Sequence, residues 1–322
     1  MVDFSDVRGK WDLGELPSLT GKVAIVTGAN SPNGIGYNIA HQLFLKGAKV
    51  YVGARSIEKA TGAIKTMAAS APTLDSGLLK PFVADLADLK SVQHAAKQVS
   101  TQEDRLDIIV NNAAYTTLTN LSEDQTVDAN GISPPIAVTH FGGFVLTTTL
   151  LPLLTKTAKL PDADVRVVTV SSVALWDAPA TSKFDSLDAL NNSYKTDATG
   201  PVFSFISATF DESVRDNHRS NYNCYGYGKL TNVLFASELQ RRLDAQGVPI
   251  LSLSVHPGGV ATNGALGFLG SDNVSNPPMS LQPSFYTVPC YLHRDMDFPV
   301  KDFTGSYRRV AYNLAISLGL QS

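Results

Sequence analysis

A tyrosine and a lysine stand four positions apart in the stretch YNCYGYGK, residues 222–229. Of the 11 tyrosines, only Tyr225 has a lysine at this spacing, Lys229, and on a helix the two side chains would share one face. An ammonium beside a phenol favours the phenolate and lowers the tyrosine pKa from about 10, which makes the phenol a proton donor near neutral pH. The pair therefore predicts acid catalysis, although the same spacing also occurs on helix surfaces without a catalytic role.

Two glycines, Gly226 and Gly228, lie within this pair. Glycine is a poor helix former, so the stretch is an unfavourable way to begin a helix. We expect the helix to begin here nonetheless, with the glycines leaving room for a cofactor and a substrate against the backbone.

A glycine-rich turn, TGANSPNGIG at 27–36, follows a predicted strand and precedes a predicted helix. Backbone N–H groups in such a turn, together with the positive end of a helix dipole, suit a pyrophosphate. Gly28, Gly34 and Gly36 would let the backbone approach it without Cβ clashes. A tight connection with no ligand has the same composition, so the turn gains weight only from the strand and helix around it.

The second predicted strand ends with Ala54 and Arg55, where folds that bind NAD have a carboxylate for the ribose 2′-hydroxyl. A guanidinium pairs instead with a 2′-phosphate, so this position favours NADP(H). The alternative is a solvated strand end. Asp85 and Leu86 close the third strand and Asn112 follows the fourth, at the sheet edge where such folds bind ligands.

The elements that must position these residues alternate along the chain. Continuous Val and Ile runs, as in a sheet buried on both faces, predict six strands, at 23–28, 49–55, 78–86, 106–114, 165–172 and 248–259. Helical spacing is clearest at 38–47 and 230–247. This alternation predicts a Rossmann-like, doubly wound parallel α/β sheet with helices on both faces. We expect residues 1–322 to form one domain, with an irregular insertion at 177–221 and an irregular lid segment at 263–300 near the substrate site.

The composition excludes several classes of protein. Apolar residues make up 43% and charged residues 17% of the chain, and the net charge of −3 comes without any basic cluster, so we expect no nucleic-acid partner. The 2 cysteines, Cys224 and Cys290, lack metal-ligand spacing, and we expect no metal. The acidic start and the lack of a long apolar run predict no signal peptide and no membrane anchor, which suggests a cytoplasmic protein.

Together these motifs resemble the short-chain dehydrogenase/reductase family over about residues 20–262. YNCYGYGKLTNVLFASELQRRL is similar to the Tyr-x-x-x-Lys helix of its retinol-dehydrogenase-like branch, SVHPGGVAT to its Pro-Gly motif, and ARS to its NADP-preferring form. The resemblance implies that Tyr225 is the general acid, that Lys229 binds the ribose and tunes Tyr225, and that Ser172 bonds the substrate carbonyl. It further implies cofactor contacts from Gly28, Asn30, Ser31, Gly34, Ile35, Gly36, Arg55, Asp85, Leu86, Asn112, Tyr225, Lys229, Pro257, Gly258, Val260 and Thr262.

The chain departs from the family pattern at its proton relay. The family's relay asparagine is Thr139 here, within VTHFGG, and Thr139 is the fourth candidate catalytic residue. A threonine hydroxyl reaches less far, so the relay would need an extra water, or Asn130 would replace it under a gapped alignment. His140, His256 and Cys224 are interpreted as packing residues.

The insertion is the second departure, since Tyr225 follows Ser172 by 53 positions and the family typically has a dozen to two dozen there. We expect the insertion to form part of the substrate pocket wall. Its neighbourhood is rich in aromatic residues, which suit either an apolar pocket or a small core of the insertion itself: Trp176, Phe184, Phe203, Phe205 and Phe210.

The resulting hypothesis is an NADPH-dependent reductase of a small lipophilic carbonyl compound, of the kind found in secondary metabolism. The alternative is a redox-silent NADP-binding protein, or a non-redox enzyme on the same fold, motivated by the missing relay asparagine. The segment TGSYRRVAYNLAISLGLQS resembles the helix that precedes the family's last strand, so we expect six strands, with a seventh as the alternative, and a homo-oligomer is left open.

Overall fold

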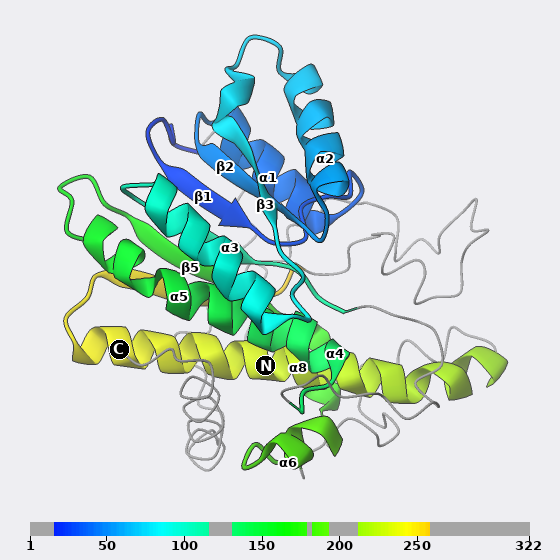
Figure 1. Ribbon diagram of the computed structural model, residues 1–322. Helices are drawn as coiled ribbons and strands as arrows, with labels where there is room; N and C mark the ends of the chain where they lie inside the picture. Colours follow the sequence, from blue (N-terminus) through cyan, green and yellow to red (C-terminus); the bar gives the residue numbers. More distant parts are fainter. Residues whose placement is uncertain (1–15, 116–130, 179–181, 193–211, 258–322) are drawn as a thin grey trace, which may run out of the picture.

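Six parallel strands form one sheet in the order β3-β2-β1-β4-β5-β6. The computed structural model describes residues 16–115, 131–178, 182–192 and 212–257 (Figure 1). The strands are β1 (Val23–Val26), β2 (Lys49–Ala54), β3 (Leu79–Val83), β4 (Ile108–Asn111), β5 (Val165–Val170) and β6 (Ile250–Val255). The predicted fold class is confirmed.

Parallel pairing brings the carboxyl ends of the strands to one edge. Val26 at the end of β1 pairs with Val52 on one side and with Val110 on the other. All four residues of β1 are buried, as a central strand covered on both faces requires. The chain reverses its direction of strand addition between β1 and β4, so the ligand crevice of such a sheet lies beside these two strands.

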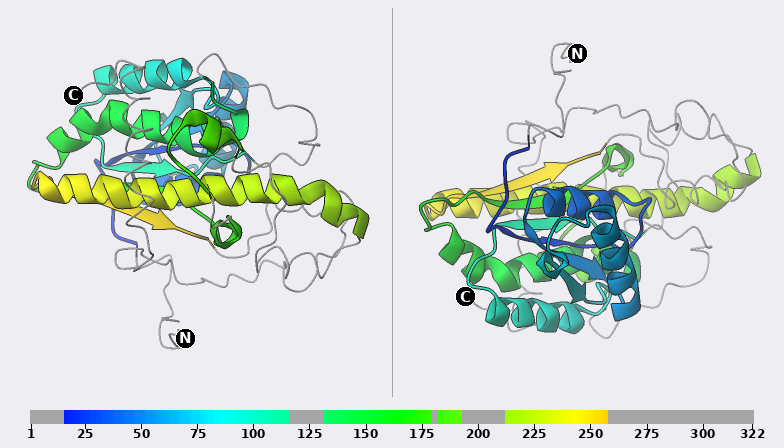
Figure 2. Two further views of the ribbon diagram at one scale, coloured as in Figure 1. Left: turned by 90° about the horizontal axis from the view of Figure 1, so that it is seen from below. Right: turned by 90° about the horizontal axis from the view of Figure 1, so that it is seen from above.

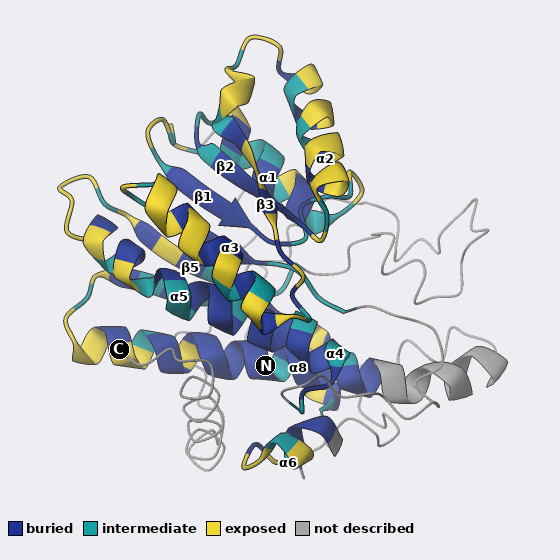
Figure 3. Ribbon diagram, in the orientation of Figure 1, coloured by how far each residue is buried: buried dark blue, intermediate teal, exposed yellow. Residues whose placement is uncertain are grey.

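Helices cover both faces of the sheet (Figure 2). The helices α1 (Ile35–Leu45) and α2 (Ile57–Ser70) pack on one face through a core that includes Phe44 and Met67. The other face carries α3 (Leu89–Gln102), α5 (Gly142–Thr157) and α8 (Glu212–Ala245). Buried residues line the sheet and the inner sides of α2 and α3, whose outer sides are exposed, while α8 is buried over most of residues 222–239 (Figure 3).

The helix that carries the Tyr225 and Lys229 pair is far longer than predicted. It runs over 34 residues, from Glu212 to Ala245, so Tyr225 lies in its interior and not at its beginning. The insertion at 177–221 is correspondingly less irregular than expected. It includes the end of the 3₁₀ helix η5 (Val173–Asp177), the short helix α6 (Leu187–Asn192) and the first turns of α8.

A π-helical turn interrupts the central helix on the α8 side of the sheet. The short helix α4 (Pro134–Ile136) continues through this turn, η4 (Ala137–Phe141), into α5. The combined segment Pro134–Thr157 is long and apolar enough to cross a membrane, but most of it is buried inside the protein. Burial in the core therefore accounts for its composition.

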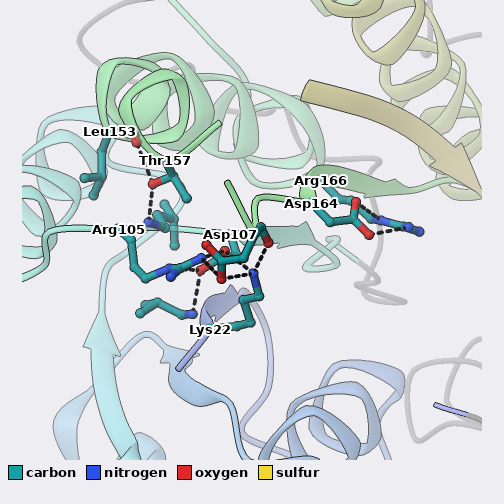
Figure 4. Close-up of polar contacts among 10 residues, drawn as sticks. Lys22, Arg105, Asp107, Leu153, Thr157, Asp164 and Arg166 are labelled. Atoms are coloured by element: carbon teal, nitrogen blue, oxygen red, sulfur yellow. Dashed lines mark hydrogen bonds and ion pairs between the residues drawn. The ribbon is translucent and has the colours of Figure 1, made fainter. Parts of the chain in front are cut away.

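A cluster of paired charges closes the opposite, amino edge of the sheet (Figure 4). The buried carboxylate of Asp107 accepts hydrogen bonds from Arg105 Nε at 3.0 Å, from Arg105 Nη2 at 2.7 Å and from the backbone N–H of Val23 at 2.9 Å. Lys22 Nζ lies 3.7 Å from the same carboxylate and 2.8 Å from that of Asp162. These pairs fix the starts of β1 and β4 relative to each other.

Candidate active site

Three of the four predicted catalytic side chains meet at the carboxyl edge of the sheet. Ser172 lies just beyond β5, and its hydroxyl is hydrogen-bonded to the side chain of Tyr225 on α8. Lys229, one helical turn further along α8, places its amine 5.4 Å from the centroid of the Tyr225 ring. Its amine donates a hydrogen bond to the carbonyl of Val170 at 2.7 Å. The predicted shared face of Tyr225 and Lys229 is therefore present.

The electrostatics of this pair differ from the prediction. Burial raises the pKa of Tyr225, and the hydrogen bond with Ser172 partly opposes that rise. Lys229 is only 1% exposed, and its burial lowers the pKa of the amine to about 7. The amine lies over the ring, 5.4 Å from its centroid, and it does not lower the pKa of the phenol. The lysine, and not the tyrosine, is the group that titrates near neutral pH here.

The two glycines serve helix packing and do not leave space for ligands. A Cβ at Gly226 would lie 2.3 Å from the carbonyl oxygen of Ala174 in η5, and a Cβ at Gly228 would lie 2.9 Å from Thr139 in η4. Real Cβ atoms essentially never approach other heavy atoms within 3.0 Å, so a larger residue at either position would displace α8, η5 or η4. The glycines allow α8 to approach η5 and η4, which brings Tyr225 to Ser172.

Thr139 lies against α8 beside Gly228, and it is buried. Its hydroxyl oxygen accepts a hydrogen bond from the backbone N–H of Tyr115 at 3.0 Å. One acceptor position of the relay candidate is thus engaged by the segment after β4. Asn130, the alternative relay residue, lies outside the described residues.

The histidine and cysteine beside the motifs are both buried, as expected of packing residues. His140 is buried, with its ring near those of Phe141 and Phe235, and burial lowers its pKa to about 4. Cys224 is also buried, which raises the pKa of its thiol to about 12. Neither group is placed to ionise at neutral pH. His256 is partly buried just beyond β6.

The glycine-rich turn has the features of an anion-binding loop. Gly28 has a φ of +64°, a conformation that favours glycine. A Cβ at Gly36 would lie 2.7 Å from the carbonyl oxygen of Gly28 and 2.4 Å from Asn112. Helix α1 follows Gly34 without a side-chain cap and without an acidic residue in its first turn. Its positive end is therefore suited to a dinucleotide pyrophosphate.

The remaining predicted cofactor residues lie around the same edge. Asn30, Ser31 and Ile35 belong to the turn itself and to the start of α1. Asn112 supports the turn, because its amide donates to the carbonyl of Thr27 at 2.9 Å.

Three further candidates follow neighbouring strands at this edge. Arg55 is exposed directly after β2, Asp85 is exposed after β3, and Leu86 is buried beside it. Pro257 follows β6, while Gly258, Val260 and Thr262 lie outside the described residues.

The aromatic residues near the insertion do not share one role. Phe184 is buried and stacks on Tyr227 with ring centroids 5.1 Å apart, and the Tyr227 hydroxyl donates to the carbonyl of Lys183 at 2.8 Å. Phe184 thus belongs to the core and does not line a pocket. Trp176 is 48% exposed. Phe203, Phe205 and Phe210 lie outside the described residues, as does the lid segment.

The sequence analysis did not identify three groups that form the hydrogen-bond network around Lys229. The Val170 carbonyl oxygen accepts a hydrogen bond from the Lys229 amine, and the Asn232 amide donates a second hydrogen bond to the same oxygen at 3.2 Å. Asn232 stands three positions after Lys229, a spacing that places both on one helix face and could have indicated it. The third is His140, which bonds Asn232 and had been interpreted as packing alone.

A buried polar contact one turn before Tyr225 was also missed. The Tyr222 phenol and the Asp177 carboxylate are hydrogen-bonded. The pKa of Tyr222 is raised, mainly by burial and to a smaller extent by this carboxylate. This contact joins the end of η5, the 3₁₀ helix that Ser172 caps, to α8. It adds to the close packing that the glycines permit.

Comparisons with known proteins agree with this geometry. Residues 22–182 match the family model described as short chain dehydrogenase. A short chain dehydrogenase/reductase of Colletotrichum higginsianum is 39% identical over 80% of this chain, which spans only 59% of that relative. A short-chain dehydrogenase/reductase of Armillaria gallica is 38% identical over 79% of this chain and 70% of its own.

A solved structure shows the same fold at lower identity. RhlG of Pseudomonas aeruginosa, in its active-site complex with NADP, has a TM-score of 0.52 and 23% identity, over 80% of this chain and 78% of its own. The family match and the fungal relatives carry the assignment: this chain belongs to the short-chain dehydrogenase/reductase family.

Proposed function

We propose that this protein is an NADP(H)-dependent oxidoreductase that reduces the carbonyl group of a small lipophilic substrate. The observation that carries the proposal is the contact of Ser172, Tyr225 and Lys229 at the edge where the glycine-rich turn also lies. We also propose that it belongs to the retinol-dehydrogenase-like branch of the family, on the motif that begins at Tyr225.

Each side chain has a distinct role in this proposal. The Tyr225 phenol would give its proton to the carbonyl oxygen as that oxygen gains negative charge. Ser172 would orient the same oxygen through its hydroxyl. Lys229 would hold the cofactor ribose and, when charged, stabilise the phenolate that remains. A bound nicotinamide would supply the hydride, while the protein supplies orientation and polarity.

The preference for NADP(H) over NAD(H) is proposed from Arg55 and from the NADP complex of the Pseudomonas aeruginosa neighbour. An exposed guanidinium after β2 suits a 2′-phosphate. Arg55→Glu should weaken NADPH binding by about 100-fold while NADH binding improves or stays level, as measured by fluorescence titration. Lys59→Glu makes the same charge change one turn into α2 and should leave the preference intact. Equal effects of the two substitutions would refute the role of Arg55.

The substrate class can be tested by the loss of NADPH absorbance against a panel of carbonyl compounds that differ in size and polarity. We expect turnover of small lipophilic ketones or aldehydes, of the kind found in secondary metabolism. Tight NADPH binding without any turnover would favour the alternative, a redox-silent NADP-binding protein or a non-redox enzyme. The engaged hydroxyl of Thr139 is the observation that favours this alternative.

Location and partners complete the proposal. We place the protein in the cytoplasm, without a nucleic-acid partner or membrane anchor, and able to form a homo-oligomer. Fluorescent tagging of the full chain and sedimentation analysis test these points. A membrane-bound pool would contradict the first, and a strict monomer at micromolar concentration would contradict the last.

A further inference from the structure

The carbonyl of Val170 lies where the parallel sheet opens at its carboxyl edge. The backbone N–H of Ser171 donates to Val255 in β6 at 2.7 Å. Since the peptide unit is planar and trans, the Val170 carbonyl points the opposite way, toward the side of β4. Strand β4 ends at Asn111, one position before it would pair with Val170. Side chains from α8 therefore reach this oxygen in place of a strand.

Two side-chain donors share this oxygen. Lys229 Nζ donates at 2.7 Å and Asn232 Nδ2 at 3.2 Å. A carbonyl oxygen has two lone pairs, so the two donors use its capacity. With one lone pair taken by Asn232, the lysine amine is confined to the other. In that place it lies over the ring of Tyr225, 5.4 Å from the centroid.

His140 sets the orientation of the Asn232 amide. Its Nδ1 lies 3.3 Å from Asn232 Oδ1, an atom that only accepts hydrogen bonds. The neutral imidazole must therefore carry its proton on Nδ1, and it directs the amide NH₂ toward Val170. Rings of Phe141, Phe144 and Phe235 surround the imidazole at centroid distances of 4.9, 6.3 and 6.0 Å. The π-helical turn η4 presents His140 to α8 at this point, as such turns often do at functional sites.

We propose that Asn232 and His140 are positioning residues, which hold the Lys229 amine against the ring of Tyr225 by sharing the Val170 carbonyl with it. The chain of contacts runs from His140 through Asn232 and Val170 to Lys229. The catalytic meaning of this arrangement rests on the proposed function. The placement of the amine does not, and it can be measured without cofactor.

The first experiment measures the pKa of Lys229 in the cofactor-free protein. The chain is labelled with ¹³Cε-lysine, and the Lys229 resonance is identified by its absence from Lys229→Met. Asn232→Asp puts a carboxylate beside the Val170 carbonyl oxygen that the Lys229 amine contacts, so the pKa of Lys229 should move up from about 7 by about one unit or more. Tyr225 and His140 are the other titratable groups at this position, and both are retained.

Thr231→Val is the matched control, since Thr231 is fully buried on the same helix and its hydroxyl donates to Gly228 at 2.7 Å. This substitution should leave the Lys229 pKa unchanged. An unchanged Lys229 pKa in Asn232→Asp, or an equal shift in Thr231→Val, would overturn the proposal.

The second experiment separates positioning from packing. His140→Leu removes the donor to Asn232, and His140→Gln retains a donor. We expect His140→Leu to lower kcat about 10-fold with little change in KM, and His140→Gln to recover most of that loss. His140→Leu and Asn232→Leu together should cost no more than the larger single effect, because the two residues act as one unit. Additive losses, or kcat losses that follow the loss of melting temperature, would reject positioning.

The two proposals fail in different ways. If the wild-type protein reduces no carbonyl compound, the proposed function is wrong. The NMR titration and the NADPH dissociation constants of the two variants, His140→Leu and His140→Gln, still test the positioning role. In that case His140→Leu should weaken NADPH binding several-fold and His140→Gln should not, whereas equal binding by both variants counts against it.

Discussion

The two edges of the sheet treat buried charge in opposite ways. At the amino edge, the Asp107 carboxylate is 1% exposed and is bound by the guanidinium of Arg105 through two hydrogen bonds. At the carboxyl edge, Lys229 is equally buried, yet the acceptor of its amine is the neutral carbonyl of Val170. Within the described part of the chain, no carboxylate forms an ion pair with Lys229.

Pairing decides whether a buried group keeps its charge. The hydrogen bond with Asp107 raises the pKa of Arg105, which favours the charged guanidinium at the amino edge. Burial without a counter-charge lowers the pKa of Lys229 to about 7, so this group changes protonation near neutral pH. The first arrangement supports stability alone, and the second is typical of a functional site. Substitutions at each edge of the sheet test its role separately.

The largest effect is expected from Tyr225→Phe, which removes the proton donor. Turnover should fall by about 1,000-fold, while NADPH binding and melting temperature stay near the wild-type values. The measurement is NADPH absorbance loss with an active carbonyl substrate. Tyr227→Phe is the matched control. Tyr227 stands two positions after Tyr225 on α8, and its hydroxyl donates a hydrogen bond to the backbone carbonyl of Lys183. Turnover that survives in Tyr225→Phe would refute the assigned acid.

Asp107→Asn breaks the amino edge instead. The substitution leaves the Arg105 guanidinium without its buried counter-charge, so the free energy of unfolding should fall by about 3 kcal/mol in urea denaturation. Turnover per folded molecule should be unchanged. Asp164→Asn, in the half-exposed pair with Arg166, should cost less than about 1 kcal/mol. Similar losses in both variants would show that burial of the pair is immaterial.

The pH dependence of stability sharpens the contrast further. Burial lowers the His140 pKa to about 4 in the folded protein, below its ordinary value of about 6.5. Between these values the unfolded chain binds more protons, so stability should fall as the pH drops from 6.5 to 4. The contribution is at most about 3 kcal/mol. His140→Gln should flatten this part of the curve, and identical pH curves for the two proteins would contradict the assignment.

The smallest effect is expected from Lys156→Ala. Lys156 lies 3.1 Å from Asp104, but both side chains are exposed, at 61% and 103%. Water screens such pairs, so the melting temperature should change by less than about 1 °C. A larger loss would mean that exposure is a poor guide to which ion pairs stabilise this protein.

Much of the fold could be predicted from short apolar runs. The six strands were placed correctly because most of them are Val- or Ile-rich runs between turn signals, with β3 (LKPFV) as the weakest, and their parallel order follows from the alternation with helices. The beginning of α8 was misplaced, because the low helix propensity of Gly226 and Gly228 indicated a helix boundary where the helix in fact continues. Their necessity comes from contacts with η5 and η4, elements distant in sequence, so no local pattern could reveal it.

The sequence by itself determined the fold class, the family and the residues that meet at the site, because spacing along strands and helices fixes which side chains share a face or an edge. Only the tertiary structure decided what those residues do to one another. Burial lowers the pKa of Lys229, whereas the sequence had predicted a lowered pKa for Tyr225. Desolvation depends on what surrounds a group in three dimensions, and a one-dimensional pattern does not contain that information.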